Sequence, residues 1–308
     1  MKILVTGGAG FIASHVTDAY IAAGHDVVVV DNLSTGRRSN INPEAKFYEL
    51  DLHDPALKQV FDVERPEVVN HHAAQIDVRR SVADPAYDAE VNTLGGIKLL
   101  NYCRDYQVRK VIYISSGGAI YGEPSYLPCD EVHPVAPLSP YGASKYSIEL
   151  YLNIYKQAYG LDYTILRYAN VYGPRQNPEG EAGVVAIFTA QMMRGRPVRI
   201  FGDGKQERDF IYVADCARGN VLALTQGSGR AFNLGVGIPT TVNEIFSNLQ
   251  EIIEYPSLPI HEPAKAGEVF RIYLNTNRAQ TELGWKAQVS LQEGLQQTVD
   301  YFRSKENI

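Results

Sequence analysis

The 308-residue sequence is short of several features, and each shortage narrows the class of protein. It has only three cysteines, Cys103, Cys129 and Cys216, without paired or zinc-ligand spacing, so we expect reduced thiols rather than a disulfide framework or a structural zinc site. It has no run of Lys and Arg, and its net charge of -6 argues against a nucleic-acid-binding surface. The apolar stretch Ile3 to Val5 is too short for a membrane span or the core of a signal peptide. Together these shortages favour a cytoplasmic protein.

The first half of the sequence alternates short β-branched runs with segments of helical period, which is the pattern of β-α-β units. The continuous apolar run from Val27 to Val30 suits a strand covered by helices on both faces, and hence a parallel sheet. We therefore predict an α/β fold built on a Rossmann-type doubly wound parallel sheet. Its predicted strands span residues 3–6, 26–31, 46–50, 67–70, 110–115 and 163–167.

The composition of the sequence changes near residue 170, where loops rich in Pro and Gly begin to separate shorter elements. We predict a main domain over residues 1–170 and a smaller C-terminal α/β lobe over residues 171–308. The chain is expected to return to the main domain near 209–225, because residues 209–213 resemble a buried strand and residues 216–224 a helix.

The segment from Ile3 to Ser14 reads as a strand, a glycine turn and a helix start. It contains Gly8-x-Gly10-x-x-Ala13, the dinucleotide-binding pattern in which glycines and a helix N-terminus receive a pyrophosphate. The next predicted strand ends in Asp31, whose carboxylate can accept hydrogen bonds from both ribose hydroxyls. The cofactor is therefore expected to be NAD, since Asp31 would repel a 2′-phosphate.

Some residues near this segment leave alternatives open. Arg37 and Arg38 keep NADP in consideration, because guanidinium groups bind phosphate. The adjacent His71 and His72 suggest a metal, but no second ligand pair stands at metal spacing, so we interpret them as residues of a strand end and predict no metal site.

The run from Ser139 to Lys145 predicts the start of a helix, with Ser139 as N-cap and Pro140 in the first helical position. Tyr141 and Lys145 are four residues apart and so share one helix face. A phenolate favoured by a neighbouring ammonium and a nicotinamide cation can take a proton from a substrate hydroxyl while a hydride leaves to the nicotinamide. These two residues are the predicted centre of an active site.

With these motifs in place, the sequence resembles the extended short-chain dehydrogenases/reductases, and within them the UDP-glucose 4-epimerases. The resemblance covers essentially the whole chain and includes TGGAGFIAS at 6–14, DNLSTG at 31–36, HHAAQ at 71–75, SSGGAIYGE at 115–123, PYGASK at 140–145, RYANVYGPRQ at 167–176, GEAGVVAIF at 180–188 and ERDFIYVAD at 207–215. It implies NAD-dependent inversion at C4 of a UDP-hexose, a place in galactose metabolism, and a homodimer formed by helices near 92–105 and 141–159.

The resemblance also assigns residues to the site. The predicted catalytic residues are Tyr141, Lys145 and Ser116. The predicted cofactor-binding residues are Gly7, Gly10, Phe11, Ile12, Asp31, Asn32, Leu33, Ser34, Thr35, Gly36, Asp51, Leu52, His72, Ala73, Ala74, Gln75, Asn92, Ser115, Tyr141, Lys145 and Tyr168. The predicted residues for the UDP-sugar are Ser116, Asn170, Val185, Ala186, Ile187, Phe188, Arg208 and Lys265.

The sequence departs from the family pattern at two places. Ala13 replaces a third glycine, and its methyl group is expected to loosen the packing of helix against strand slightly. Gly117 stands where many epimerases carry the catalytic hydroxyl, so we assign that role to Ser116, with Ser115 as second choice.

Two other functions remain as alternatives. The first is another sugar-nucleotide reaction, although Gly118 and Ala119 stand where related dehydratases carry Asp-Glu and decarboxylases a Glu. The second is a nucleotide-sensing protein without turnover, against which the intact Tyr141 and Lys145 argue.

Overall fold

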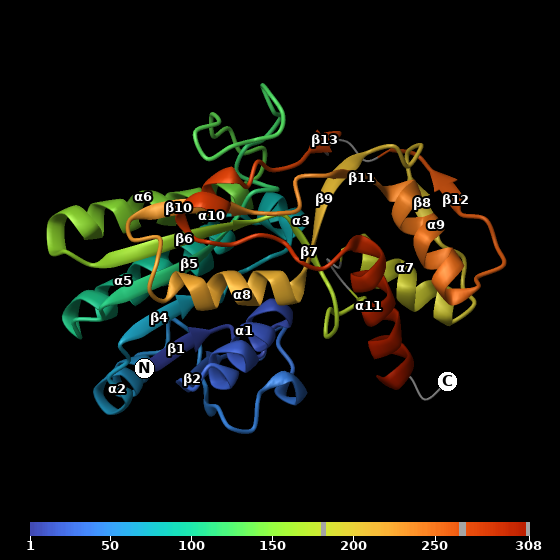
Figure 1. The fold of residues 1–308 in the computed structure, drawn as a ribbon. Helices are drawn as coiled ribbons and strands as arrows, with labels where there is room; N and C mark the ends of the chain where they lie inside the picture. Colours follow the sequence, from blue (N-terminus) through green and yellow to red (C-terminus); the bar gives the residue numbers. More distant parts are fainter. Residues whose placement is uncertain (180–182, 265–268, 306–308) are drawn as a thin grey trace.

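A computed structural model describes residues 1–179, 183–264 and 269–305. Its central layer is a seven-stranded parallel sheet in the order β10-β6-β5-β4-β1-β2-β3 (Figure 1). All six strands predicted from the sequence lie in this sheet, and the predicted Rossmann-type fold is confirmed. The strands are β1(Lys2–Thr6), β2(Asp26–Asp31), β3(Lys46–Glu49), β4(Val68–His71), β5(Lys110–Ser116), β6(Asp162–Tyr168) and β10(Arg230–Leu234).

Helices cover both faces of the sheet because the strands are apolar on both sides. In β1, Ile3 and Val5 face one hydrophobic core and Leu4 faces the other, which follows from the two-residue period of a strand. The first core is closed by α1(Phe11–Ala22), α8(Val213–Ala223) and α10(Asn277–Glu282), and the second by α2(Leu57–Glu64), α5(Gly95–Asp105) and α6(Pro140–Tyr159). Ala13 is buried in the first core, where α1 packs over the sheet.

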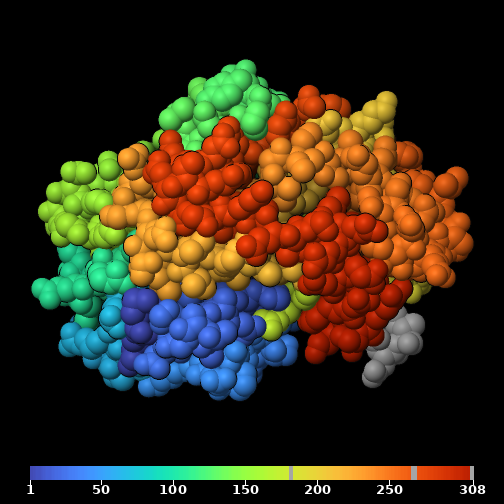
Figure 2. Space-filling model, in the orientation of Figure 1, coloured from blue at the N-terminus to red at the C-terminus, as the bar shows by residue number. Residues whose placement is uncertain are grey.

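The smaller lobe has a core of its own. It is built from α7(Val184–Met193), α9(Val242–Ile253) and α11(Leu291–Lys305) around a four-stranded sheet of β7(Asn170–Tyr172), β9(Glu207–Tyr212), β11(Pro239–Thr241) and β13(Arg271–Ile272). A two-stranded sheet of β8(Arg199–Phe201) and β12(Ile260–Glu262) completes it. In Figure 2 the red C-terminal residues lie beside both the blue main layer and the orange lobe.

The sequence predicts that the chain returns to the main domain near 209–225, and in the structure the helix of this segment returns but the strand does not. Helix α8 packs against α1 in the main domain, but β9 pairs with β7, β11 and β13 in the lobe. The seventh strand of the main sheet is instead β10, which pairs with β6. No sequence pattern predicts β10, because Arg230 to Leu234 contains no β-branched residue.

Short helices fill the connection between β4 and α5, at the carboxyl ends of the strands. They are α3(Val78–Ala83), α4(Pro85–Asp88) and a π-helix over Ala89–Leu94. A 3-10 turn, Arg38–Asn40, follows β2.

Within the described ranges, no helix has both the length and the apolar character needed to cross a membrane.

Candidate active site

The turn after β1 lets another part of the backbone pass very close to it. Gly7 has a φ of +71°, and a Cβ atom on it would lie 2.7 Å from the backbone nitrogen of Ala73, so only glycine fits here. Gly10, which has no side chain, is the N-cap of α1. The N–H groups of the first helical turn therefore face the end of the sheet, where they can receive a phosphate.

Asp31 closes this turn from the end of β2. Its carboxylate accepts hydrogen bonds from the backbone N–H groups of Ala9 at 3.0 Å and Leu33 at 2.7 Å. Burial raises the pKa of Asp31, and these two hydrogen bonds partly lower it again. A Cβ atom on Gly36 would lie 2.9 Å from Asp31 Oδ1. The segment 32–36 thus wraps closely around the carboxylate that is expected to bind the ribose.

The two arginines that left NADP open are engaged with other side chains. Arg37 donates a hydrogen bond to Asn177 Oδ1 at 2.8 Å, and Arg38 forms an ion pair with Glu49. The geometry therefore favours an unphosphorylated ribose beside Asp31.

The other predicted adenine-side residues differ in exposure. The side chain of Asn32 is exposed and donates to Asp51 Oδ2 at 2.7 Å, whereas Leu52 is buried in the core under α2. Ser34 and Thr35 are exposed, and Phe11 and Ile12 are partly buried at the start of α1.

The end of β4 lies next to this turn. The His71 ring is hydrogen-bonded to the Thr6 hydroxyl at 2.7 Å, and that hydroxyl accepts from the N–H of Ala73 at 3.2 Å. Burial lowers the pKa of His71 to about 3 and that of His72 well below its usual value, with a further contribution from Lys145. Among the described residues no group of three or more His, Cys, Asp or Glu is arranged to hold a metal ion.

Helix α6 presents the two residues predicted to carry the chemistry. The Ser139 side chain accepts from Gly142 N at 3.2 Å and Pro140 occupies the first turn, the predicted start of the helix. Lys145 Nζ donates to the carbonyl oxygen of Ile114 in β5 at 2.9 Å and lies 5.2 Å from the centre of the Tyr113 ring. Lys145 is thereby fixed against the carboxyl end of β5.

Three effects set the acidity of the Tyr141 hydroxyl. Burial raises the pKa of Tyr141 to about 12, the Asp88 carboxylate adds to the rise, and a hydrogen bond with Ser116 lowers it. We expected Lys145 to be the group that lowers this pKa. In the structure the Ser116 hydroxyl does so, because the Lys145 ammonium is turned toward the carbonyl of Ile114.

The ammonium of Lys145 is itself sensitive to its surroundings. Burial lowers the pKa of Lys145 to about 8, while the carboxylates of Asp88 and Glu149 act in the opposite direction. Both carboxylates therefore help to keep this lysine charged.

The two candidate serines point in opposite directions because they are neighbours on one strand. Ser116 is partly exposed and bonded to Tyr141, whereas Ser115 is buried and its Oγ has no hydrogen-bond partner within the described residues. A Cβ atom on Gly117 would lie 2.6 Å from Leu274 Cδ1. Leu274 therefore leaves little room for a side chain at position 117, and Ser116 is the candidate hydroxyl beside Tyr141.

The residues predicted to bind the UDP-sugar are only partly brought together. Asn170 is exposed at the start of β7, with its Oδ1 placed 3.3 Å from where a Cβ atom on Gly118 would be. Arg208, partly exposed on β9, donates to the carbonyl oxygens of Glu207 at 2.9 Å and Phe270 at 3.2 Å. Lys265 lies outside the described residues.

Several predicted contacts point away from the site. Val185, Ala186 and Phe188 of α7 bury their side chains in the lobe, and Ile187 packs partly against the same core. The Tyr168 side chain is buried under the main sheet, where its hydroxyl accepts from Asn220. Ligand contacts from these residues would have to use the backbone, except for the partly exposed Ile187.

The comparisons with known proteins agree with this geometry. A sequence model described as the NAD dependent epimerase/dehydratase family matches residues 3–235. The chain belongs to this family. It is 48% identical, over 98% of each chain, to a putative UDP-glucose 4-epimerase of Methanocaldococcus jannaschii.

Solved structures extend the likeness to the whole fold of this family member. A UDP-glucose 4-epimerase of Thermotoga maritima with UDP-glucose has a TM-score of 0.97 and 51% identity over 99% of both chains. A UDP-glucose 4-epimerase of Thermus thermophilus in complex with NAD has a TM-score of 0.94 and 43% identity, over 99% of this chain and all of the other.

One residue of the epimerase/dehydratase site, Asp88, is not marked by any motif in the sequence. Asp88 contacts Gln75 and Asn92, both predicted as cofactor residues, and it acts electrostatically on Tyr141 and Lys145. Asp84 caps a helix before Pro85, a pattern that could have predicted α4, but no motif marks the buried carboxylate that follows.

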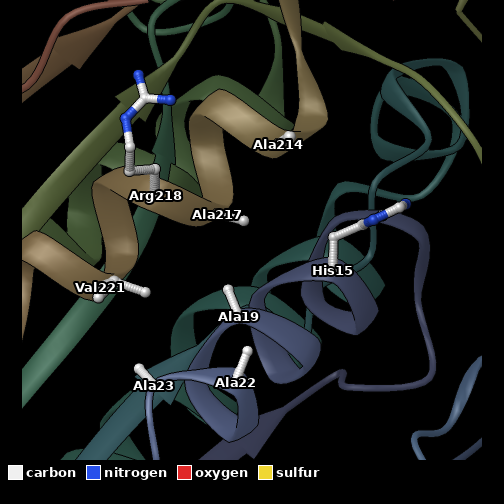
Figure 3. A pocket seen from close by; sticks show the side chains of 8 residues that line it. All are labelled: His15, Ala19, Ala22, Ala23, Ala214, Ala217, Arg218 and Val221. Atoms are coloured by element: carbon white, nitrogen blue, oxygen red, sulfur yellow. The ribbon is translucent and has the colours of Figure 1, made fainter. Parts of the chain in front are cut away.

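A surface groove between α1 and α8 lies apart from these residues (Figure 3). Alanines from both helices line it, with His15 and Arg218 at its edges. His15 is hydrogen-bonded to the carbonyl of Pro174, and Arg218 is paired with Asp215. The two polar side chains thus serve contacts within the fold.

Proposed function

We propose that this protein inverts C4 of a UDP-hexose, most simply interconverting UDP-glucose and UDP-galactose, with NAD held throughout. The observation that carries the proposal is the grouping of three side chains beside the glycine turn. Ser116 lies at the carboxyl end of β5, and Tyr141 and Lys145 lie in the first turns of α6. The three relatives described above, at 43% to 51% identity, carry the name UDP-glucose 4-epimerase, in one case as putative. The reaction would serve galactose metabolism.

The NAD site is supported by the fit of the residues that would form it. Gly7 and Gly10 leave room for the pyrophosphate at the N-terminus of α1, and Asp31 lies where the adenosine ribose would end. When bound, the nicotinamide supplies a reversible hydride acceptor. The remaining tasks, which are to move a proton, orient the sugar and fix the charges, fall to side chains of this chain.

Tyr141 is the group that moves the proton. In one half of the reaction it takes the proton of the sugar 4-OH as C4 is oxidised, and in the other half it returns that proton after the 4-keto sugar has turned over. The Ser116 hydroxyl, hydrogen-bonded to Tyr141, stabilises the oxygen that changes charge. Lys145, fixed on Ile114 O, would hold the nicotinamide ribose.

The residues after Ser116 oppose the alternative reactions. A 4,6-dehydratase must also remove a proton from C5 and protonate the leaving C6 oxygen, which needs a further acid/base pair. Gly118 and Ala119 occupy the corresponding positions and carry no group that can move a proton. These residues therefore support a product that keeps its C6 oxygen and differs from the substrate at C4.

The UDP-sugar would lie between the end of β5 and the lobe. Asn170 next to Gly118 suits a hydrogen bond to the sugar nucleotide, and Arg208 suits the diphosphate because a guanidinium matches phosphate oxygens. Lys265 is proposed as a second cation, and the N-terminal turn of α7 around Val185–Phe188 as the uridine side.

We further propose a homodimer formed by α5 and α6. Leu150 and Ile154 on α6 and Leu94 immediately before α5 are about half exposed, at 50%, 51% and 54%, and exposed apolar side chains favour burial between copies. A cytoplasmic location is supported by Cys103, Cys129 and Cys216, all free thiols.

Incubation of the purified protein with a panel of UDP-, dTDP- and GDP-sugars, followed by product identification, tests the proposal. We expect the C4 epimer of a UDP-hexose. Tyr141→Phe should fold and bind NAD while turnover falls by roughly two to four orders of magnitude. Tyr159→Phe, at an exposed position near the end of the same helix, is the matched control and should keep full activity. NAD-loaded protein that converts none of these sugars would instead favour a nucleotide-sensing role.

A further inference from the structure

Asp88 is a fully buried carboxylate beside the proposed catalytic residues. It is the last residue of α4 and has no exposed surface. Its Oδ1 atom accepts hydrogen bonds from Gln75 Nε2 at 2.9 Å and from Asn92 Nδ2 at 3.1 Å. Its Oδ2 atom is buried without a hydrogen-bond partner in the part of the chain that the structure describes. A carboxylate with one oxygen unsatisfied is costly to bury, so Asp88 calls for an explanation in terms of function.

The partners of Asp88 connect it to the catalytic helix. Asn92 and Gln75 are joined twice, because Gln75 N donates to Asn92 Oδ1 at 2.8 Å and Asn92 Nδ2 donates to Gln75 O at 3.0 Å. Asn92 Nδ2 also lies 3.3 Å from Ser144 Oγ, which in turn donates to Tyr141 O at 3.0 Å. Asp88 therefore holds the loop after β4 and the first turn of α6 in one network.

The backbone around Asp88 is shaped to permit these contacts. Asp88 ends α4 and the π-helix Ala89–Leu94 begins directly after it. A π-helical turn is rare and is often found at functional sites. Here it places Asn92, on the wide turn, between Asp88 and Ser144.

The charge of Asp88 acts on both proposed catalytic residues in the same direction. It raises the pKa of Tyr141 and also that of Lys145, where its contribution exceeds that of Glu149. In both residues burial has the larger influence, because it raises the pKa of Tyr141 and lowers the pKa of Lys145.

Other ionisable groups surround this centre and differ in their access to water. The exposed ones are Arg79 and Arg80 of α3 and Glu90 of the π-helix, and Asp77 before α3 is partly exposed; water screens such charges. The buried or partly buried ones around Lys145 are His71, His72, Tyr113 and Glu149. Glu149 is paired with Arg167, whereas the described contacts give Asp88 amide partners only.

We propose that Asp88 is a positioning residue whose buried negative charge keeps a proton on both Tyr141 and Lys145 while its hydrogen bonds fix Gln75 and Asn92. This proposal rests on the proposed function. An epimerase must both remove and return the proton of the 4-OH, so a fixed negative charge that favours protonated Tyr141 supports the return half of the reaction.

The direct test is the pH dependence of turnover in Asp88→Asn. The amide oxygen can still accept from Gln75 and Asn92, so the shape is kept while the charge is lost. Without the charge both groups hold their protons less tightly, and we expect both limbs of the profile, whichever of the two groups each limb reports, to move to lower pH by about one unit. Asp77→Asn removes a carboxylate that caps α3, and this control should leave both limbs in place.

A second variant and a second measurement keep the test decisive. Asp88→Glu retains the charge and should keep the limbs near their original pH even if its turnover is lower. In addition, the ionisation of Tyr141 can be followed by phenolate absorbance in NAD-loaded protein. For each variant, the difference in absorbance between the protein with Tyr141 and the same protein carrying Tyr141→Phe isolates the contribution of Tyr141. Its midpoint should fall to lower pH in Asp88→Asn.

The absorbance titration needs no turnover, so it separates this proposal from the proposed function. A shifted Tyr141 midpoint in a protein without epimerase activity would support the role of Asp88 and overturn the proposed reaction. Active protein in which Asp88→Asn lowers turnover with both limbs and the Tyr141 midpoint unmoved would show that Asp88 is merely structural, and would overturn the inference.

Discussion

The hydroxyl groups of Ser116 and Tyr141 are joined by a hydrogen bond that spans the end of β5 and the first turn of α6. This bond lowers the pKa of Tyr141 against the opposing effects of burial and Asp88. Ser116 can therefore act in two ways, because the same hydroxyl can favour ionisation of Tyr141 and donate a hydrogen bond to the sugar oxygen.

The first prediction compares the two neighbouring serines. Ser116→Ala should reduce kcat by roughly a hundredfold or more, the range for loss of a donor aimed at a developing charge. Ser115→Ala should cost much less, because the Ser115 hydroxyl is buried away from Tyr141. Steady-state kinetics of both variants decide the ranking. The opposite ranking would show that the strand end is oriented differently from the arrangement described above.

The second prediction concerns the pH dependence of cofactor binding. The pKa of Lys145 is lowered to about 8, chiefly by burial, so its ammonium is present below that pH and lost as the pH rises through it. The affinity for NAD, to whose ribose Lys145 is proposed to bind, should therefore decline above about pH 8 in calorimetric titrations. Lys145→Arg, whose guanidinium stays charged, should be less active yet show no such decline. A decline that survives in Lys145→Arg would mean that another group titrates there.

The sequence predicted the main sheet well because its strands are continuous apolar runs, such as Val27 to Val30, that suit burial on both faces. The placement of Tyr141 and Lys145 on one face of the same helix followed from helical spacing alone. Asp88 could not be predicted in this way, since its partners Gln75 and Asn92 meet it only through the fold.

The lobe was harder to predict for a similar reason. An apolar segment such as 185–188 can face a ligand or a core, and only the packing of α7 shows that Val185 and Phe188 face the core. The block at Gly117 depends on Leu274, a residue distant in sequence.

The third prediction uses this block. Gly117→Ser restores the hydroxyl of the family pattern but places Cβ 2.6 Å from Leu274 Cδ1, so it should lower the free energy of unfolding by about 1–3 kcal/mol. Gly118→Ser is the matched control, because among the described residues its Cβ would meet only Asn170 Oδ1 at 3.3 Å and Ser116 Oγ at 3.9 Å. Urea denaturation measures both.

The double variant Gly117→Ser with Leu274→Ala checks the cause. If Leu274 is the obstacle, the two substitutions should together cost less than the sum of their separate effects. Strict additivity would assign the strain at Gly117 to some other contact.

The fourth prediction concerns cofactor choice. Asp31→Ala should weaken NAD binding by roughly ten- to a hundredfold, as expected for loss of hydrogen bonds to a charged group worth about 1.5–3 kcal/mol, and should relax the preference against NADP. Arg37→Ala, which removes a guanidinium bonded to Asn177, should leave the preference unchanged. Calorimetric titration with both dinucleotides provides the comparison. NADP released from the purified protein would contradict the role given to Asp31.

The most direct test of the central claim is the fate of the hydrogen on C4. UDP-glucose carrying deuterium at C4 is incubated with NAD-loaded protein and the product is examined by mass spectrometry and NMR. We expect UDP-galactose that retains the deuterium at C4 and the oxygen at C6, without accumulation of NADH, and formation of this product by Tyr141→Phe at a rate lower by roughly two to four orders of magnitude. A 4-keto-6-deoxy sugar, release of carbon dioxide, stoichiometric NADH or loss of the deuterium to solvent would contradict it.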